Sequence, residues 1–503
     1  MNWFVTPHTQ NRIPLERIPV LAYAQFYTDV QELLAGEHFH CAHYFGVPDA
    51  QGTRFYCLLL DDESASVWIA SWQQNYYEEA EYPSLTALFP ALHPFERGIT
   101  EQFGLKFSDH PYDKPLRFAH DRRNRREGIN DYPFYAIDSP SVHEVNVGPI
   151  HAGVIEPGAF RFICNGEQIL HMEVVLGYQH RGVEKLMAQT SNRLRQSVLA
   201  ESIAGDTAVS HALACACLIE TLAGISPNAR LEQERTVAQE LERIAVHVGD
   251  TAALCMDVGF QLGQVACEAL RTIAINTIQC WCGNRFGKTL IRPGGSRYPL
   301  TKTLSDLIVD NVKEVRRRYT EVCEDLFSTP SVLARFEECG KVGRMQMARI
   351  GAVGQSARAS GLLRDIRKTH PYGVYSEVMM HEPVVLKTGD VMARAQMRYR
   401  EVLQSIETIL KLLRESPAGD VGSPDYEKAL SPDCLSFALT EGWRGEICHV
   451  GLTDAGGNLV HYKVKDPSMH NWYALSLAVR GAGISDFPVN NKSFNLSYCG
   501  HDL

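Results

Sequence analysis

Cysteine and histidine side chains could give this chain a metal site, because thiolates and imidazoles are common ligands of transition metals. The chain has 14 cysteines and 19 histidines, yet it contains no C-x-x-C and no H-E-x-x-H motif. Two C-x-C pairs, Cys215/Cys217 and Cys280/Cys282, lie inside apolar runs. This pattern is typical of reduced, buried thiols in a cytoplasmic protein.

Two other groupings could do chemistry. His143, His151, His171 and His180 lie near one another in the sequence, but spacings of 8, 20 and 9 residues fit no metal template and favour structural histidines. The string from 283 to 289 resembles a phosphate-binding loop, but it is one residue short between its glycines. We therefore expect neither a histidine-bound metal nor a nucleotide at these places.

The composition limits the classes of partner. The chain has 503 residues, 45% of them hydrophobic and 21% charged, which is typical of a folded protein with two or more domains. Its 49 Lys+Arg and 59 Asp+Glu give a net charge of −10, which argues against nucleic-acid binding. Basic clusters at 122–126 and 316–318 are expected to be solvated; the alternative is docking to an acidic protein or anionic lipid.

No part of the sequence predicts a membrane span or a secretion signal. The most apolar region, 209–225, contains His211 and Glu220 and predicts a buried core helix. Residues 1–11 lack a basic segment followed by an apolar one. We expect a cytoplasmic protein that only other subunits could hold at a membrane.

The first block, 1–118, predicts a small α+β domain. Residues 55–60 and 66–69 mix aromatic and β-branched residues between turn signals and predict strands, whereas 20–35 predicts a helix. A basic segment that contains Asn, Gly and Asp, 119–145, predicts a linker.

The second block, 146–503, predicts a helical bundle flanked by small sheets. Ser226-Pro227 is a helix-start signal, and apolar residues then recur every three or four positions as far as Gly249, the expected stop. The other elements that we expect are a helix over 391–413 and strands over 158–164, 168–175, 446–452 and 458–464.

Several strings in the second block together resemble the 49-kilodalton-type subunit of respiratory complex I and the large subunit of membrane-bound, energy-converting nickel–iron hydrogenases. They follow the family's order along the chain. The strings are Asn146-Val-Gly-Pro149, Pro157-Gly158 with Arg161, Tyr178-Gln-His-Arg-Gly-Val-Glu-Lys185, Glu240-Leu-Glu-Arg243, Ile291-Arg-Pro-Gly-Gly295, Ala357-Arg-Ala-Ser-Gly361, Gly389-Asp-Val-Met-Ala-Arg394 and Arg444-Gly-Glu446.

The first block resembles the 30-kilodalton-type partner subunit of the same complexes. The matching strings are Glu96-Arg97, Phe103-Gly104 and His110-Pro111. Hydrogenases of the formate-hydrogenlyase type carry both pieces fused in this order. The resemblance therefore implies a domain like the 30-kilodalton subunit of complex I over 1–118, a linker over 119–145, and over 146–503 a domain like the 49-kilodalton subunit and the hydrogenase large subunit.

The family's nickel–iron centre is held by two C-x-x-C pairs, and the resemblance places them on Ala204/Thr207 and Ser497/Gly500. Nickel and iron at such a centre need soft thiolate ligands, which alanine and glycine cannot provide. Cys499 is displaced by one position, and one thiol cannot hold a metal that needs four. We therefore expect no nickel–iron site and no hydrogenase activity.

The quinone-binding positions of the complex I branch are also changed. There a histidine and a tyrosine hydrogen-bond the quinone headgroup, and the matching positions here are Pro157 and Gly205, neither of which offers a side-chain hydrogen bond. His151, Asp206 and His211 are candidates for binding a quinone by other contacts. A purely structural role is the alternative for each.

Some polar positions of the family are retained. Arg444 lies where an arginine of the hydrogenases faces the metal site, with tryptophan in place of the preceding proline, and Arg358, Asp365, Glu441 and Asp486 match other polar positions. Buried arginines and carboxylates are costly unless paired. They either form a structural ion-pair network or line a route for protons or substrate.

The resemblance implies an NADH-quinone oxidoreductase- or hydrogenase-type subunit with NAD- and quinone-linked chemistry, attached peripherally to the cytoplasmic side of the inner membrane. We expect partner subunits to carry the iron–sulfur clusters: a small subunit of the 20-kilodalton type found in complex I, and a ferredoxin-like subunit. Antiporter-like and anchor subunits would lie in the membrane. The chain itself would bind no cofactor other than a candidate quinone, with Arg444, His151, Asp206 and His211 as its functional residues.

Two roles remain open within that complex. The chain either passes electrons from a neighbouring cluster to an acceptor, coupled to ion translocation, or it is a non-catalytic scaffold or coupling element. The region where the two ligand pairs would have met distinguishes the two roles. An open, polar-lined cleft favours redox chemistry, and filling by Tyr498, Val209 and their neighbours favours a scaffold.

Overall fold

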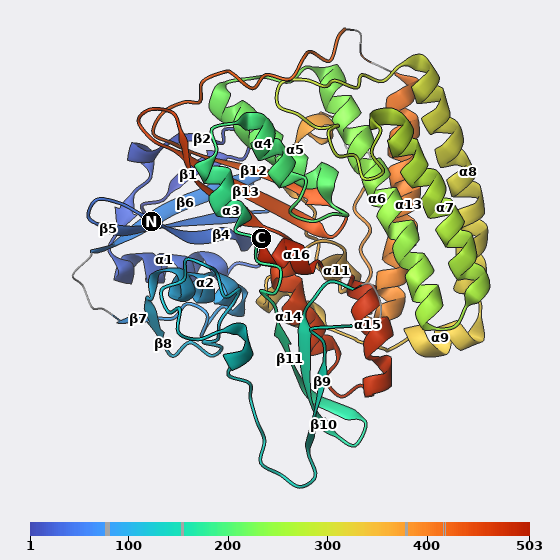
Figure 1. The fold of residues 1–503 in the computed structure, drawn as a ribbon, viewed down its shortest axis with the longest axis horizontal. Coiled ribbons are helices and arrows are strands. Elements are labelled where there is room, and N and C mark those ends of the chain that lie inside the picture. The colour runs from blue at the N-terminus through green and yellow to red at the C-terminus, as the bar shows by residue number, and fades with distance from the viewer. Residues whose placement is uncertain (76–80, 152–154, 378–380, 416, 418) are drawn as a thin grey trace.

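The computed structural model describes the chain except for residues 76–80, 152–154, 378–380, 416 and 418. Its N-terminal part is a five-stranded sheet in the order β1-β6-β5-β4, with β3 added in parallel to β6 and helices α1 and α2 beside it (Figure 1, blue). The bounds are β1 Phe4–Pro7, β3 Val20–Leu21, β4 Phe39–Pro48, β5 Gly52–Asp61, β6 Ser66–Asn75, α1 Tyr23–Leu34 and α2 His93–Phe103.

The helix predicted over 20–35 begins later than expected. Val20 and Leu21 form β3, paired with Ser71 and Trp72 of β6, and α1 starts only at Tyr23. The sheet edge recruits these two residues because their backbone groups can bond to β6. The two predicted strands are both present and longer, as β5 and β6.

A second sheet joins the two ends of the chain. Its order is β14-β13-β12-β2, so that β2 from the N-terminal part pairs with β12 from the C-terminal part. The strands are β2 Arg12–Pro14, β12 Cys434–Gly442, β13 Gly445–Thr453 and β14 Leu459–Lys465. Sequence reasoning found β13 and β14 but missed β12, although β12 and β13 are both buried at every position.

The helical bundle packs beside that sheet (Figure 1, right). It comprises α5 Ala208–Ala223, α6 Ala229–Asp257, α7 Gln261–Cys282, α8 Lys302–Leu326 and α13 Val391–Arg414. Its apolar core includes Leu241, Ile278 and Ile406, each at most 2% exposed. Within the described part of the chain, no helix combines the length and apolarity needed to span a membrane.

The ends of α6 differ from the prediction. Asn228, and not the Ser-Pro pair, caps the helix: its side chain accepts a hydrogen bond from the backbone N–H of Leu231. Gly249 does not stop the helix, which continues to Asp257. A Cβ at Gly249 would lie 2.6 Å from Cδ of Arg271, so glycine here permits close packing against α7.

The third sheet, β11-β10-β9, packs against the C-terminal helices around Phe162 and Phe487 (Figure 1, bottom). The strands are β9 His143–Val147, β10 Ala159–Asn165 and β11 Gln168–Val175; the helices are α14 Ser468–Ala478, α15 Phe487–Phe494 and α16 Tyr498–Asp502. The predicted fold class, a small α+β domain followed by a mainly helical domain with small flanking sheets, is confirmed. The predicted domain boundaries stay a prediction.

The remaining elements are short. They are β7 Glu81–Pro83, β8 Lys106–Ser108, α3 Val183–Gln189, α4 Arg193–Ala200, α9 Pro330–Phe336, α10 Arg344–Arg349, α11 Gly354–Ala359, α12 Ile366–Thr369 and the 3-10 helices η1 Leu15–Arg17, η2 Pro90–Leu92, η3 Ile129–Asp131, η4 Gly373–Ser376 and η5 Ile484–Asp486.

Candidate functional site

Two segments, 204–207 and 495–500, contain the positions aligned with the metal ligands and form the first and second ligand segments. They meet beside the β12–β13 turn. Ala204 and Thr207 precede α5 and are fully buried. Ser497 caps α16, where its hydroxyl accepts the backbone N–H of Gly500 at 2.9 Å. The fold therefore brings together the four positions that sequence reasoning aligned with the cysteine ligands.

Arg444 bridges these two segments from the β12–β13 turn. Its two terminal nitrogens each donate to one carboxylate oxygen of Asp206 at 2.7 Å, and one of them also reaches the Thr207 hydroxyl at 3.0 Å. Its Nε donates to the carbonyl of Asn495 at 2.6 Å, and its guanidinium lies over the Trp443 ring. The guanidinium thus occupies the space between the two segments.

Asp206 is the part of this site that reaches the surface. Its side chain is 36% exposed whereas that of Arg444 is 4% exposed. Desolvation raises the pKa of Asp206, but the charge and hydrogen bonds of Arg444, together with the hydrogen bond from Thr207, outweigh it, so that the net shift is downward. A Cβ on the neighbouring Gly205 would meet nothing within 4 Å, so the space beside Asp206 is open.

A chain of buried polar groups runs inward from the second ligand segment. Asp466 contacts Nε2 of His211 at 3.1 Å, Nδ1 of His211 contacts His449 at 3.0 Å, and His449 contacts the Tyr462 hydroxyl at 2.7 Å. Burial and the neighbouring His211 lower the pKa of His449, which is therefore neutral. The positive charge of Arg444 also helps to lower the pKa of Asp466.

The residues present do not fit a nickel–iron centre. A Cβ on Gly500 would lie 2.6 Å from Oδ2 of Asp466, and Ala204 has no ligand atom. In the part of the chain that the structure describes, no group of three or more His, Cys, Asp or Glu side chains is arranged to hold a metal ion.

His151 lies at the connection between β9 and β10. Its Nε2 contacts the carbonyl of Gly158 at 2.9 Å, and a Cβ on Gly158 would lie 2.4 Å from the Tyr498 ring. This connection therefore packs on the second ligand segment. Of the four candidates, Arg444 and Asp206 are paired directly, and His211 approaches them through Asp466. Among the described residues, the hydrogen bond of His151 is to Gly158 in its own connection.

Glu242 is a site residue that sequence reasoning missed. Its carboxylate accepts the backbone N–H groups of Val209 and Ser210 and the Ser210 hydroxyl, at 2.6–3.2 Å. Burial raises its pKa to about 7, and the charge of Asp206 contributes in the same direction. Glu242 lies in the family string Glu240-Leu-Glu-Arg243, but the sequence does not show which way its side chain points.

Replacing Glu242 with glutamine should change how stability depends on pH. The native state keeps the proton up to about pH 7 whereas the unfolded chain loses it near pH 4.5, so the wild type becomes less stable as pH rises through this window. Glu242→Gln removes this loss, which is at most about 3 kcal/mol. Urea unfolding at pH 5 and pH 8 measures it, with the exposed Glu268→Gln as control; equal pH dependence in Glu242→Gln and wild type would contradict the assigned pKa.

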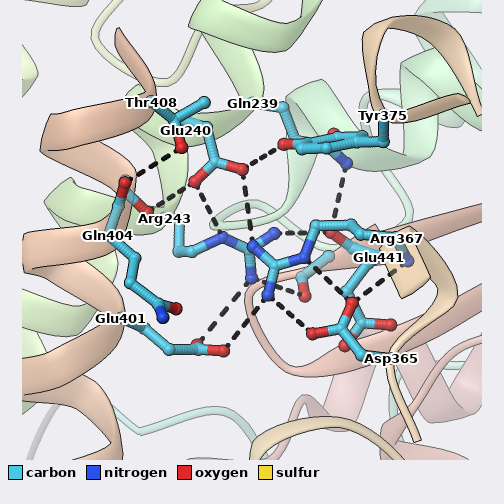
Figure 2. Close-up of polar contacts among 12 residues, drawn as sticks. Gln239, Glu240, Arg243, Asp365, Arg367, Tyr375, Glu401, Gln404, Thr408 and Glu441 are labelled. Atoms are coloured by element: carbon cyan, nitrogen blue, oxygen red, sulfur yellow. Dashed lines mark hydrogen bonds and ion pairs between the residues drawn. The ribbon is translucent and has the colours of Figure 1, made fainter. Parts of the chain in front are cut away.

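A network of buried ion pairs lies between α6, α13 and the β12–β13 sheet, and Figure 2 shows its carboxylates around Arg243 and Arg367. Arg358 contacts Asp365 and Glu441, each at 2.9 Å, and also Glu401. Arg367 contacts Asp365 at 2.7 Å. Three of the polar positions highlighted from the sequence therefore contact one another directly.

The charges of this network balance only if one carboxylate keeps its proton. Three arginines, Arg243, Arg358 and Arg367, face four carboxylates, Glu240, Asp365, Glu401 and Glu441. Burial and the neighbouring Asp365 raise the pKa of Glu441, which makes Glu441 the protonated member. Each of the three arginines contacts at least one carboxylate, which favours a structural role for the network, whereas Nε of Arg358 is buried without a hydrogen-bond partner in the described part of the chain.

Other residues highlighted from the sequence lie elsewhere. Asp486 pairs with Arg335 at 3.0 Å on the surface, apart from the network. Arg317 of the basic cluster 316–318 is exposed on α8 and pairs with Glu314. Nδ1 of His180 contacts the carbonyl of Asp502 at 2.8 Å, which is a structural contact.

Comparisons with known proteins match both parts of the chain. Residues 21–127 match the family model of the respiratory-chain NADH dehydrogenase 30 Kd subunit, and residues 257–438 match that of the 49 Kd subunit. The carbon monoxide-induced hydrogenase of Rhodospirillum rubrum is 30% identical over 350 residues, which cover 69% of this chain and 96% of that protein.

Two further relatives match over most of their length. Formate hydrogenlyase subunit 5 of Escherichia coli (strain K12) is 27% identical, over 88% of this chain and 80% of the relative. The C/D fusion protein of the NADH-quinone oxidoreductase of Phocaeicola vulgatus is 26% identical, over 77% and 80%. A chain in the structure of the membrane-bound sulfane sulfur reductase, an archaeal respiratory membrane complex, has a similar fold, with a TM-score of 0.68 and 23% identity over 73% of this chain and 100% of that chain.

Proposed function

Because the chain belongs to the family of the 30 Kd and 49 Kd subunits of complex I, which includes the large subunits of membrane-bound hydrogenases, we propose that it passes electrons from an iron–sulfur partner subunit to an acceptor, with a quinone as the leading candidate. In this proposal electron transfer is coupled to ion translocation by membrane subunits, and the chain has no nickel–iron centre of its own.

The observation that carries this proposal is the Arg444–Asp206 pair beside an open surface. At a site that has lost its function, replacement of a buried arginine by apolar side chains would stabilise the fold. Here the arginine is held by four hydrogen bonds, and its partner Asp206 is 36% exposed beside Gly205. Arg444 can stabilise negative charge that develops on an acceptor bound there.

Glu242 can supply or hold a proton near that acceptor. Glu242, with a pKa near 7, exchanges a proton at neutral pH, which suits general acid–base work. Asp466 and His211 form a second buried pair, connected to Arg444 through the charge of Asp466. Electron transfer to an acceptor at Asp206 could therefore be balanced by protons from the protein interior.

Exposed apolar side chains on the β9–β10 connection and on α4 support docking of a partner. Ile150 and Ile155 lie on the β9–β10 connection and are 93% and 54% exposed, and Leu194 and Val198 on α4 are also exposed. Such side chains mark protein contacts when they gather on one part of a surface. We propose the small iron–sulfur subunit of the 20-kilodalton type as this partner, with a ferredoxin-like subunit and antiporter-like and anchor membrane subunits completing a complex on the cytoplasmic face.

A non-catalytic scaffold is the second candidate. It is favoured by the close contact between Gly500 and Asp466, which leaves no room for a ligand atom at that position. The space between the segments is filled by Arg444 and Asp206, however, and not by Tyr498 and Val209 as the scaffold hypothesis expected. Tyr498 packs instead against Trp472.

Re-oxidation of the partner's clusters tests the two candidates. The complex should be purified from membranes by an N-terminal tag, since Met1 is exposed and Leu503 is buried. After reduction by dithionite, the cluster signal in electron paramagnetic resonance should disappear within seconds of adding decylubiquinone or menadione. Clusters that stay reduced for minutes with both quinones would support the scaffold.

A further inference from the structure

A cavity of about 530 Å³ lies between the N-terminal domain and the large domain. One wall is formed by β4 and α2, and the other by α3 and β14. Its apolar lining includes Phe95, Ile99, Leu116 and Met469. Arg444, Asp206 and their hydrogen-bond partners do not line it, whereas Tyr462, at the end of the buried polar chain, does. Its size and place between domains are typical of a small-molecule site.

Two histidines of the cavity wall have ring nitrogens that are buried within the wall and lack partners among the described residues. His43 is 4% exposed, and within the described part of the chain neither of its ring nitrogens has a hydrogen-bond partner. Nε2 of His461, whose ring stacks on Phe45, is also buried and unpartnered there. Burial lowers the pKa of both imidazoles to about 3, so each is neutral and can donate one hydrogen bond and accept another.

The charged side chains of the lining include a cation with unused donors, Arg117. Nε of Arg117 donates to the carbonyl of His501 at 2.6 Å, but the described residues provide no hydrogen-bond acceptor for its two terminal nitrogens. The neighbouring Glu184 is engaged by Lys463 at 2.8 Å, and Glu101 accepts backbone N–H groups, including that of Arg117. Arg117 attracts Glu184 electrostatically, yet its outer donors remain available for a ligand.

We propose that this cavity binds an amphipathic small molecule with an apolar, aromatic body and one anionic group. The body packs against Phe95, Ile99 and Met469, and the anionic group accepts hydrogen bonds from the outer nitrogens of Arg117. The inference is separate from the redox role, because none of these residues belongs to the Arg444–Asp206 site.

Filling the cavity tests this proposal. Gly98 on α2 lines the cavity, and a Cβ there would meet only Cδ2 of Leu116, at 3.4 Å. Gly98→Leu should therefore fill the space, while Gly98→Ala serves as the matched control. The probe is 8-anilinonaphthalene-1-sulfonate, an aromatic body with one sulfonate, titrated by calorimetry into the assembled complex; the difference between the two variants cancels probe bound elsewhere.

We expect Gly98→Ala to bind one probe molecule per chain and Gly98→Leu to bind it at least about tenfold more weakly. Val460→Trp fills the cavity from the opposite wall and should act like Gly98→Leu if that variant folds poorly. Neither variant should alter quinone-dependent re-oxidation, which separates this test from that of the redox role. Equal binding by the filled and control variants would overturn the proposal. Binding of the probe to the isolated chain but not to the assembled complex would also overturn it, because a partner subunit would then cover the cavity.

The charge of the probe tests the role of Arg117. N-phenyl-1-naphthylamine has the same aromatic body without the sulfonate. The sulfonated probe should bind more tightly to the wild type, and Arg117→Gln should remove that preference. A preference that survives Arg117→Gln would show that the anionic group is not recognised by Arg117.

Discussion

Replacing Arg444 with alanine should slow quinone-dependent re-oxidation of the clusters about 100-fold while the complex stays assembled. The loss follows from the position of the guanidinium, which lies between the two ligand segments and holds Asp206 by two hydrogen bonds of 2.7 Å. Folding should survive because Asp206 is partly exposed and water can replace the lost bonds.

Two matched variants separate charge from geometry at this site. Arg444→Lys keeps the charge but not the two-pronged contact, and should retain part of the rate. Asp206→Asn removes the negative partner and leaves Arg444 positively charged, so it should slow the reaction less than the loss of Arg444. If turnover by Arg444→Ala equals that of the wild type in an intact complex, the chain is a scaffold.

Replacing Arg358 with methionine should destabilise the chain by about 3–5 kcal/mol. Arg358 is fully buried and contacts Asp365, Glu401 and Glu441. Its removal leaves two arginines against three ionised carboxylates, so that one buried negative charge is uncompensated. Urea unfolding of the tagged chain and the yield of assembled complex both measure the loss.

Two variants control this second prediction. Arg317→Met removes an exposed arginine that pairs with Glu314 on α8, and should change stability by no more than about 0.5 kcal/mol. Adding Glu401→Gln to Arg358→Met removes the uncompensated negative charge and should recover part of the stability. If Arg358→Met is as stable as the wild type, the network does not contribute to the free energy of unfolding as its contacts imply.

The elements that carry clear patterns could be predicted from the sequence. Periodic apolar residues located α13 to within one residue, and alternating runs located β10 and β11. Failures came from tertiary contacts: β6 recruits Val20 and Leu21 into a strand, and Arg271 explains the glycine within α6. Neither contact leaves a local trace in the sequence.

The candidate site could be located but not assembled from the sequence. The family strings identified the segments around Asp206, Arg444 and Ser497, but Arg444 and Asp206 are 238 residues apart and only folding shows that they form a pair. Glu242 was missed because its role depends on which way α6 faces. The cavity at His43 combines two domains and could not be foreseen from either.

Metal analysis of the purified complex tests the central claim, that this chain works without a nickel–iron centre. The N-terminally tagged complex should be analysed by inductively coupled plasma mass spectrometry beside a nickel–iron hydrogenase as a positive control. We predict iron from the clusters of the partner subunits and less than about 0.1 nickel atom per chain, because Ala204 and Gly500 offer no ligand atom. About one nickel per chain would contradict the account.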